Sequence, residues 1–124
     1  MREEARLWLG QADEDFITAK KNIEIKRFYA SVFFAQQAAE KALKGLYLEK
    51  KREPYLRHNL VEMADILGAP EEVKSACRFL NPQYAVSRYP DAAGGLPADA
   101  YDKFLAEKII ESSKKVINWA KKNL

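Results

Sequence analysis

The chain has 124 residues, a length typical of one domain, so we expect a single domain spanning residues 1–124. Its apolar fraction of 48% and charged fraction of 31% are ordinary for a folded protein and exclude a disordered chain. The net charge of +3 is compatible with an anionic partner but does not require one.

Several classes of protein are excluded by what the sequence lacks. No apolar run approaches the roughly 18 residues that a membrane-spanning helix needs. Residues 1–6 lack the apolar core of a signal peptide, so we expect a cytoplasmic protein. Cys77 is the only cysteine and His58 the only histidine, which excludes an internal disulfide and a zinc site built from these residue types. We therefore expect no metal and no cofactor.

Two long helices are predicted first. Apolar residues recur at steps of three and four over Glu3–Ile23 and again over Arg27–Lys50, which indicates one buried face in each range. Alanines dominate the middle of the second range, so a neighbouring helix can approach closely there. Glu40 precedes Lys44 by four residues, the order that favours a surface ion pair on a helix.

Two shorter helices are predicted next. Pro54 blocks continuation of the preceding helix, and the range His58–Leu67 is apolar at helical spacing up to Gly68, which suits a helix end. The next helix begins at Pro70 and ends before Pro82, because proline fits the first turn of a helix but restricts the residue before it.

Residues 81–98 are the one long irregular segment, and loops of this length in a compact domain are usually functional or disordered. The last helix is predicted from Asp99 to Lys122, with Asp102 completing a weak capping box. Five helices without strands or repeats predict an all-α, up-and-down five-helix bundle. The apolar surface of the three long helices exceeds what the bundle can bury, which favours a homodimer.

His58 is the first candidate for chemistry. A histidine at a helix start has its charged form disfavoured by the helix dipole, which suits a general base or a hydrogen-bond donor. The alternative is that the imidazole caps backbone groups or packs between two helices.

The second candidate is the cluster of Tyr84, Arg88, Tyr89 and Asp91 in the irregular segment. Arginine grips phosphate with two hydrogen bonds, and tyrosine rings stack on bases. The alternative is an internal ion pair between Arg88 and Asp91 that pins the loop.

Four stretches together resemble the stand-alone prokaryotic HEPN proteins. They are Trp8 with the acidic run 13–16, residues 33–46 (FFAQQAAEKALKGL), residues 58–60 (HNL) and residues 88–91 (RYPD). The resemblance covers essentially the whole chain. It implies a helical bundle that usually dimerises and often pairs with a minimal nucleotidyltransferase in toxin–antitoxin-like systems.

Many proteins of that family are metal-independent RNases whose active site is an Arg followed, four to six residues later, by a His. This sequence departs from the pattern, because no His follows Arg88. Arg52 and His58 have a matching spacing, but Pro54 interrupts any helix that they would share.

We therefore interpret the chain as a non-catalytic or catalytically reduced HEPN-like domain that binds nucleotide or RNA and a minimal nucleotidyltransferase. The resemblance and the loop chemistry together favour Tyr84, Arg88, Tyr89 and Lys44 as the binding residues. One alternative is a metal-independent RNase in which His58 acts with Arg52, Arg57 or Arg88. The other is a structural module that binds only protein.

Overall fold

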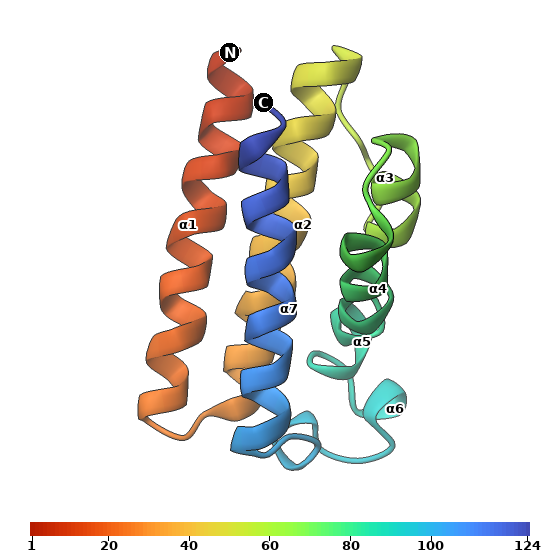
Figure 1. Cartoon of the computed structure of the whole chain (residues 1–124). Helices are drawn as coiled ribbons and strands as arrows, with labels where there is room; N and C mark the ends of the chain where they lie inside the picture. Colours follow the sequence, from red (N-terminus) through yellow and green to blue (C-terminus); the bar gives the residue numbers. More distant parts are fainter.

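Four rows of helix form the molecule, and three of them are single long helices. A computed structural model describes all 124 residues. The long rows are α1 (Glu3–Glu24), α2 (Phe28–Lys51) and α7 (Lys103–Lys122). In Figure 1, α1 runs antiparallel to both α2 and α7, and the two termini lie at the same end of the bundle. None of the helices combines the length and apolar character needed to cross a bilayer.

The fourth row is broken into short helices that follow one another down one side of the bundle (Figure 1). They are α3 (Leu60–Ile66), α4 (Glu71–Leu80) and α5 (Gln83–Val86), and α6 (Pro90–Ala93) lies beyond them. The all-α bundle expected from the sequence is confirmed, and its five helices correspond to α1, α2, α3, α4 and α7.

Residues 81–98 are more regular than the sequence predicted. They contain α5, α6 and a 3-10 helix at Pro97–Asp99. Pro82 and Pro90 stand at the starts of the two one-turn helices, where the fixed φ of proline suits a first turn. Gly94 ends α6 with a φ of +70°, a conformation that glycine adopts without steric cost.

Two helix starts also differ from the prediction, because asparagine and aspartate side chains form the caps. Asn59 caps α3 by accepting a hydrogen bond from the Glu62 amide at 3.1 Å, so His58 lies just outside that helix. Asp102 caps α7 by accepting from the Leu105 amide at 2.8 Å, so this helix begins after Asp102 rather than at Asp99.

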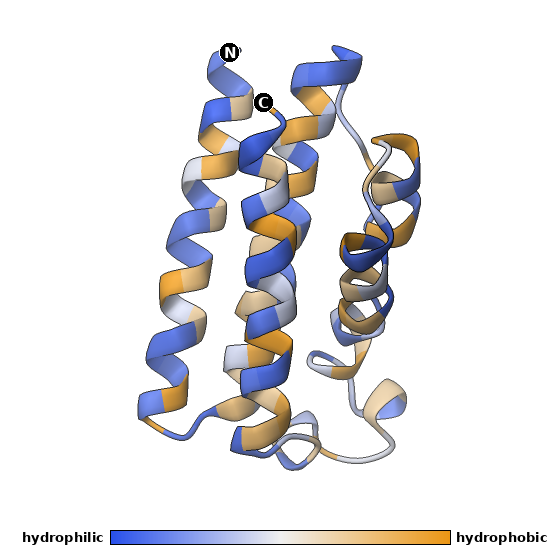
Figure 2. Ribbon diagram, in the orientation of Figure 1, coloured by the Kyte–Doolittle hydropathy of each residue, from blue (hydrophilic) through white to orange (hydrophobic).

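Helix α2 runs through the centre of the core. Its alanines at 35, 38, 39 and 42 are fully buried, and Leu43 and Leu46 are buried with them. Figure 2 shows hydrophilic and hydrophobic residues alternating along the outer helices, as expected for helices with one buried face. At Gly45, an added Cβ would lie 3.2 Å from the Ala5 carbonyl oxygen and from side-chain atoms of Trp8 and Leu9. Helices α1 and α2 therefore approach each other closely at this point.

We predict that Gly45→Leu lowers the free energy of unfolding by about 1–3 kcal/mol, because the larger side chain forces α1 away from α2. Gly10→Leu is the matched control, since a Cβ at Gly10 meets nothing within 4 Å. That control should raise stability slightly through better helix propensity. Urea denaturation of both variants measures the difference. Equal stabilities would show that the close approach at Gly45 is not a constraint.

Candidate functional site

His58 and Glu40 form the centre of the candidate site. The Nδ1 atom of His58 lies 2.8 Å from the Oε2 atom of Glu40, which joins the segment before α3 to the middle of α2. The Glu40 side chain is 4% exposed, whereas the His58 side chain is 50% exposed. The buried carboxylate therefore contacts the inner edge of the imidazole. The rest of the ring faces solvent, and its Nε2 atom has no hydrogen-bond partner in the protein.

Two further groups on α2 hold the Glu40 carboxylate. Gln36 donates from Nε2 to Glu40 Oε1 at 3.1 Å, and Lys44 Nζ lies 3.1 Å from Glu40 Oε2. Burial alone would raise the pKa of Glu40. The hydrogen bonds from His58 and Gln36, with the charge of Lys44, outweigh that effect and lower its pKa below the ordinary 4.5.

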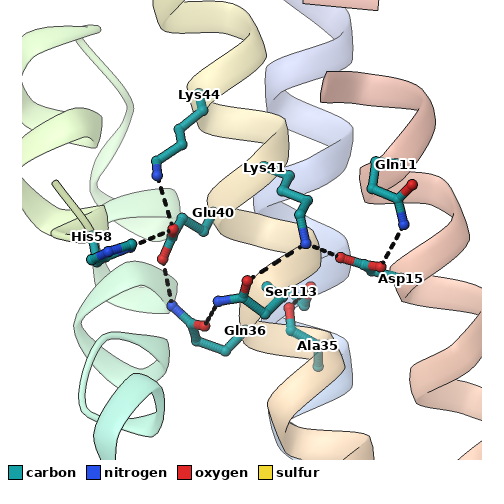
Figure 3. Close-up of polar contacts among 10 residues, drawn as sticks. Gln11, Asp15, Ala35, Gln36, Glu40, Lys41, Lys44, His58 and Ser113 are labelled. Carbon is teal, nitrogen blue, oxygen red and sulfur yellow. Dashed lines mark hydrogen bonds and ion pairs between the residues drawn. The ribbon is translucent and has the colours of Figure 1, made fainter. Parts of the chain in front are cut away.

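A chain of polar contacts continues from Glu40 across α2 to α1. Figure 3 shows His58 on one side of α2 and Asp15 on the other. Between Gln36 and α1, the chain consists of a hydrogen bond from Gln37 to Gln36, one from Lys41 to Gln37, an ion pair of Lys41 with Asp15, and a hydrogen bond from Gln11 to Asp15. The acidic and basic groups of this layer therefore compensate one another.

Arg88 is held by aromatic rings instead of an acid. Its guanidinium carbon lies 4.3 Å from the ring centroid of Phe33 and 4.4 Å from that of Tyr84. Tyr84 in turn stacks on His58, with ring centroids 4.5 Å apart and planes inclined by 23°. These contacts bring α2, α5 and the segment before α3 together at one surface.

The charge of Arg88 has no acidic partner. No ion pair in the chain includes this residue, and its buried Nε atom has no hydrogen-bond partner. The Arg88–Asp91 ion pair considered from the sequence is not formed. Instead Asp91 Oδ1 accepts a hydrogen bond from the Ala92 amide at 3.0 Å, at the start of α6. Arg88 is thus a positioned cation with unused donors beside an aromatic face, which is the chemistry that binds phosphate groups.

The other predicted residues lie in different settings. Lys44 is almost buried and joins Glu40 to the indole of Trp8, whose centroid is 5.6 Å from Nζ. Tyr89 is 48% exposed and outside the cluster. Arg57 pairs with Glu62, and Arg52 ends α2 in a left-handed conformation, so neither arginine joins His58.

Sequence reasoning missed Glu40, Gln36 and Phe33 as parts of the site. It predicted the Glu40–Lys44 pair, but as a surface pair, and the structure buries both side chains. The signal that was available is the four-residue spacing of Gln36, Glu40 and Lys44, which places all three on one face of a helix whose middle is rich in alanine. A row of polar residues on one face of such a helix indicates a buried network when another element covers it.

Nucleophilic and metal chemistry have little support elsewhere in the chain. Burial raises the pKa of the Cys77 thiol to about 12, so this cysteine stays protonated at neutral pH. No group of three or more His, Cys, Asp or Glu side chains is arranged to hold a metal ion.

We predict that acid destabilises the wild-type protein more steeply than Glu40→Gln. The pKa of Glu40 is lowered in the folded chain, so its contribution to stability is present above the ordinary value of 4.5 and is lost as the pH falls below it. Urea denaturation at pH values from about 6 to 3 measures the slope. Glu3→Gln, at an exposed glutamate, is the control and should keep the wild-type slope. Parallel pH profiles for the wild type and Glu40→Gln would contradict this assignment.

Comparisons with known proteins agree on one family. The HEPN domain profile matches residues 5–124. The chain is similar to TT1696 from Thermus thermophilus, at 30% identity and a TM-score of 0.92 over 99% of this chain and 100% of that one. It is also similar to ST0689, described as an archaeal HEPN homologue, at 29% identity and a TM-score of 0.84 over 98% of each chain.

A HEPN domain protein from Thermotoga maritima, tm0613, shares the fold, with 22% identity and a TM-score of 0.73 over 93% of this chain and 94% of that one. No curated protein matched the sequence. The resemblance noted in the sequence is thus confirmed along nearly the full length of the chain, and the protein belongs to the HEPN domain family.

Proposed function

We propose that this protein binds nucleotide or RNA at the surface formed by Arg88, Tyr84 and His58, without cleaving it. The observation that carries the proposal is the unpaired guanidinium of Arg88, which lies over two aromatic rings. The Nε atom is buried, so the donors that remain for a ligand are those of the two Nη groups, and phosphate oxygens can accept from both of them. The Tyr84 ring lies between Arg88 and His58, so the outer face of the half-exposed His58 ring is the surface on which a base stacks.

Lys44 and Tyr89 have smaller parts in this proposal. Lys44 is neutralised by Glu40 and supports the carboxylate that orients His58, so it acts on the ligand through other residues. Tyr89 follows Arg88 directly and is exposed, which leaves its ring free to meet a ligand that extends beyond the cluster.

The second candidate function is a metal-independent RNase. It is favoured by the Glu40–His58 contact, because a neutral imidazole that donates from Nδ1 to a carboxylate has Nε2 free to accept a proton. Against it, His58 stacks on Tyr84 while Arg88 lies over the same ring, and two groups at these distances cannot share one ring face. Tyr84 then separates the base from the cation that would steady the phosphate.

We further propose a homodimer and a minimal nucleotidyltransferase partner, in a toxin–antitoxin-like pair in the cytoplasm. The family membership supports these partners, and so do exposed apolar residues on the long helices. Ile17 on α1 is 48% exposed and Phe104 on α7 is 68% exposed, and a protein surface would shield such residues from water.

We predict that Arg88→Gln weakens binding of single-stranded RNA by about tenfold or more, because a hydrogen bond to a charged group contributes about 1.5–3 kcal/mol. Arg88→Lys keeps the charge but loses the planar fork, so its affinity should be intermediate. Fluorescence anisotropy with a labelled oligonucleotide measures both. Arg78→Gln removes the same charge from an exposed arginine paired with Glu71 and should bind like the wild type. An equal loss of RNA affinity in Arg78→Gln and Arg88→Gln would show that only the net charge of the protein matters and would contradict the proposal.

We predict that labelled single-stranded RNA stays intact when it is incubated with the wild-type protein in EDTA. Gel electrophoresis of the products provides the test, with His58→Ala as the paired variant. Cleavage by the wild type that disappears in His58→Ala, while circular dichroism shows an unchanged fold, would reject the binding-only function and establish the RNase.

A further inference from the structure

A groove beside the candidate site has no ligand assigned to it above, although its Gln11 and Lys41 belong to the polar chain between α1 and α2. It has a volume of about 430 Å³ and lies between α1 and α2. We call it the tryptophan groove, and its lining residues are Glu4, Leu7, Trp8, Gln11 and Lys41. Its volume is within the range of pockets that hold small organic ligands.

The tryptophan groove and the candidate site are connected through α2. Lys44 Nζ is 3.1 Å from the same Glu40 oxygen that contacts His58, and it lies over the Trp8 ring at 5.6 Å. Lys41 extends from α2 toward the α1 side of this face, and His58 lies on the opposite side (Figure 3). The aromatic residues Tyr84 and Trp8 thus flank one central helix.

The tryptophan groove and the surface at Arg88 differ in their charge. In the tryptophan groove, Lys41 is neutralised by Asp15, and the neighbouring Lys44 is neutralised by Glu40. Glu4 adds an acidic group at the edge of the groove, which would repel a phosphate. Arg88, by contrast, keeps an uncompensated charge. A phosphate is therefore favoured at Arg88 and a neutral, flat group in the tryptophan groove.

The polar groups of the tryptophan groove also suit a base. Gln11 donates from Nε2 to Asp15 Oδ1 at 2.9 Å, so its Oε1 oxygen has no protein donor and can accept from an exocyclic amino group. The indole of Trp8 is partly exposed and is the aromatic ring among the residues that line the groove. Stacking on such a ring holds a base without selecting its identity.

From these contacts we infer that the tryptophan groove is a second base-stacking subsite, and that the ligand is a single strand of RNA that spans α2 from Arg88 to Trp8. This inference rests on the proposed function, because the phosphate of the strand is anchored at Arg88. Phe33, which lies against Arg88, and Gly45, which lies beside Trp8, are twelve residues apart on α2, a rise of about 18 Å, so a mononucleotide is too short to occupy both places. The protein therefore prefers an oligonucleotide to a mononucleotide, and the preference depends on Trp8.

The test uses the intrinsic fluorescence of Trp8. The chain has two tryptophans, so Trp119→Phe leaves Trp8 as the sole tryptophan, whose emission is followed with excitation at a wavelength that tyrosine does not absorb. We predict that a ten-nucleotide single-stranded RNA quenches this emission, whereas adenosine monophosphate at matched occupancy does not. Trp8→Leu, which keeps an apolar side chain, should weaken binding of the oligonucleotide about tenfold and leave the affinity for adenosine monophosphate unchanged. Trp119→Leu is the matched control and should bind RNA as the wild type does.

Two results would overturn the inference in distinguishable ways. The second subsite is wrong and the proposed function stands if RNA binding depends on Arg88 but RNA leaves the Trp8 emission unchanged and Trp8→Leu leaves the RNA affinity unchanged. That result would leave the groove to a protein partner. If neither RNA nor adenosine monophosphate binds the folded wild-type protein, both the subsite and the proposed function fail.

Discussion

A carboxylate that is almost removed from water governs the organisation of this surface. A buried charge is costly unless it is paired and hydrogen-bonded, and Glu40 has three partners that meet this requirement. Gln36 and Lys44 lie one turn away on the same helix, so they add no tertiary constraint. His58 is the partner from another element. The contact that compensates the buried charge of Glu40 therefore also fixes the segment before α3 against α2. The same contact orients the imidazole, so this orientation is maintained as long as the fold is stable.

Arg88, unlike Glu40, has no partner of opposite charge. Rings instead of carboxylates hold its guanidinium, and its Nε atom is buried without a partner. Aromatic faces stabilise a cation by about 0.5–2 kcal/mol without neutralising it. Positioning is thus achieved while the net charge is kept, which an ion pair with Asp91 would have removed. The same contact places the Tyr84 ring between Arg88 and His58, so the cation, the ring and the imidazole are ordered together.

The long helices could be predicted because periodicity over some twenty residues identifies a buried face, and glycine and proline mark the ends of the two shorter helices between them. The helices in residues 81–98 could not, because α5 and α6 have four residues each and show no period. The site was predictable in part. Tyr84, Arg88 and His58 were chosen by residue type, but contacts such as Phe33 with Arg88 join distant parts of the chain. The burial of Glu40 and Lys44 likewise depends on elements that local sequence does not reveal.

A net charge of +3 on a chain with 21 basic and 18 acidic residues gives weak long-range attraction for a polyanion. Nonspecific binding to nucleic acid depends on neutralising many phosphates, and most of the lysines near this surface are already paired. Affinity for the proposed RNA ligand must then come from a few local groups, namely one unpaired guanidinium and the aromatic rings around it. Stacking depends little on salt, whereas contacts with phosphate depend on it strongly. For the proposed ligand, a site of this composition favours a short, unpaired strand over a duplex, since only unstacked bases expose their faces to the His58 ring.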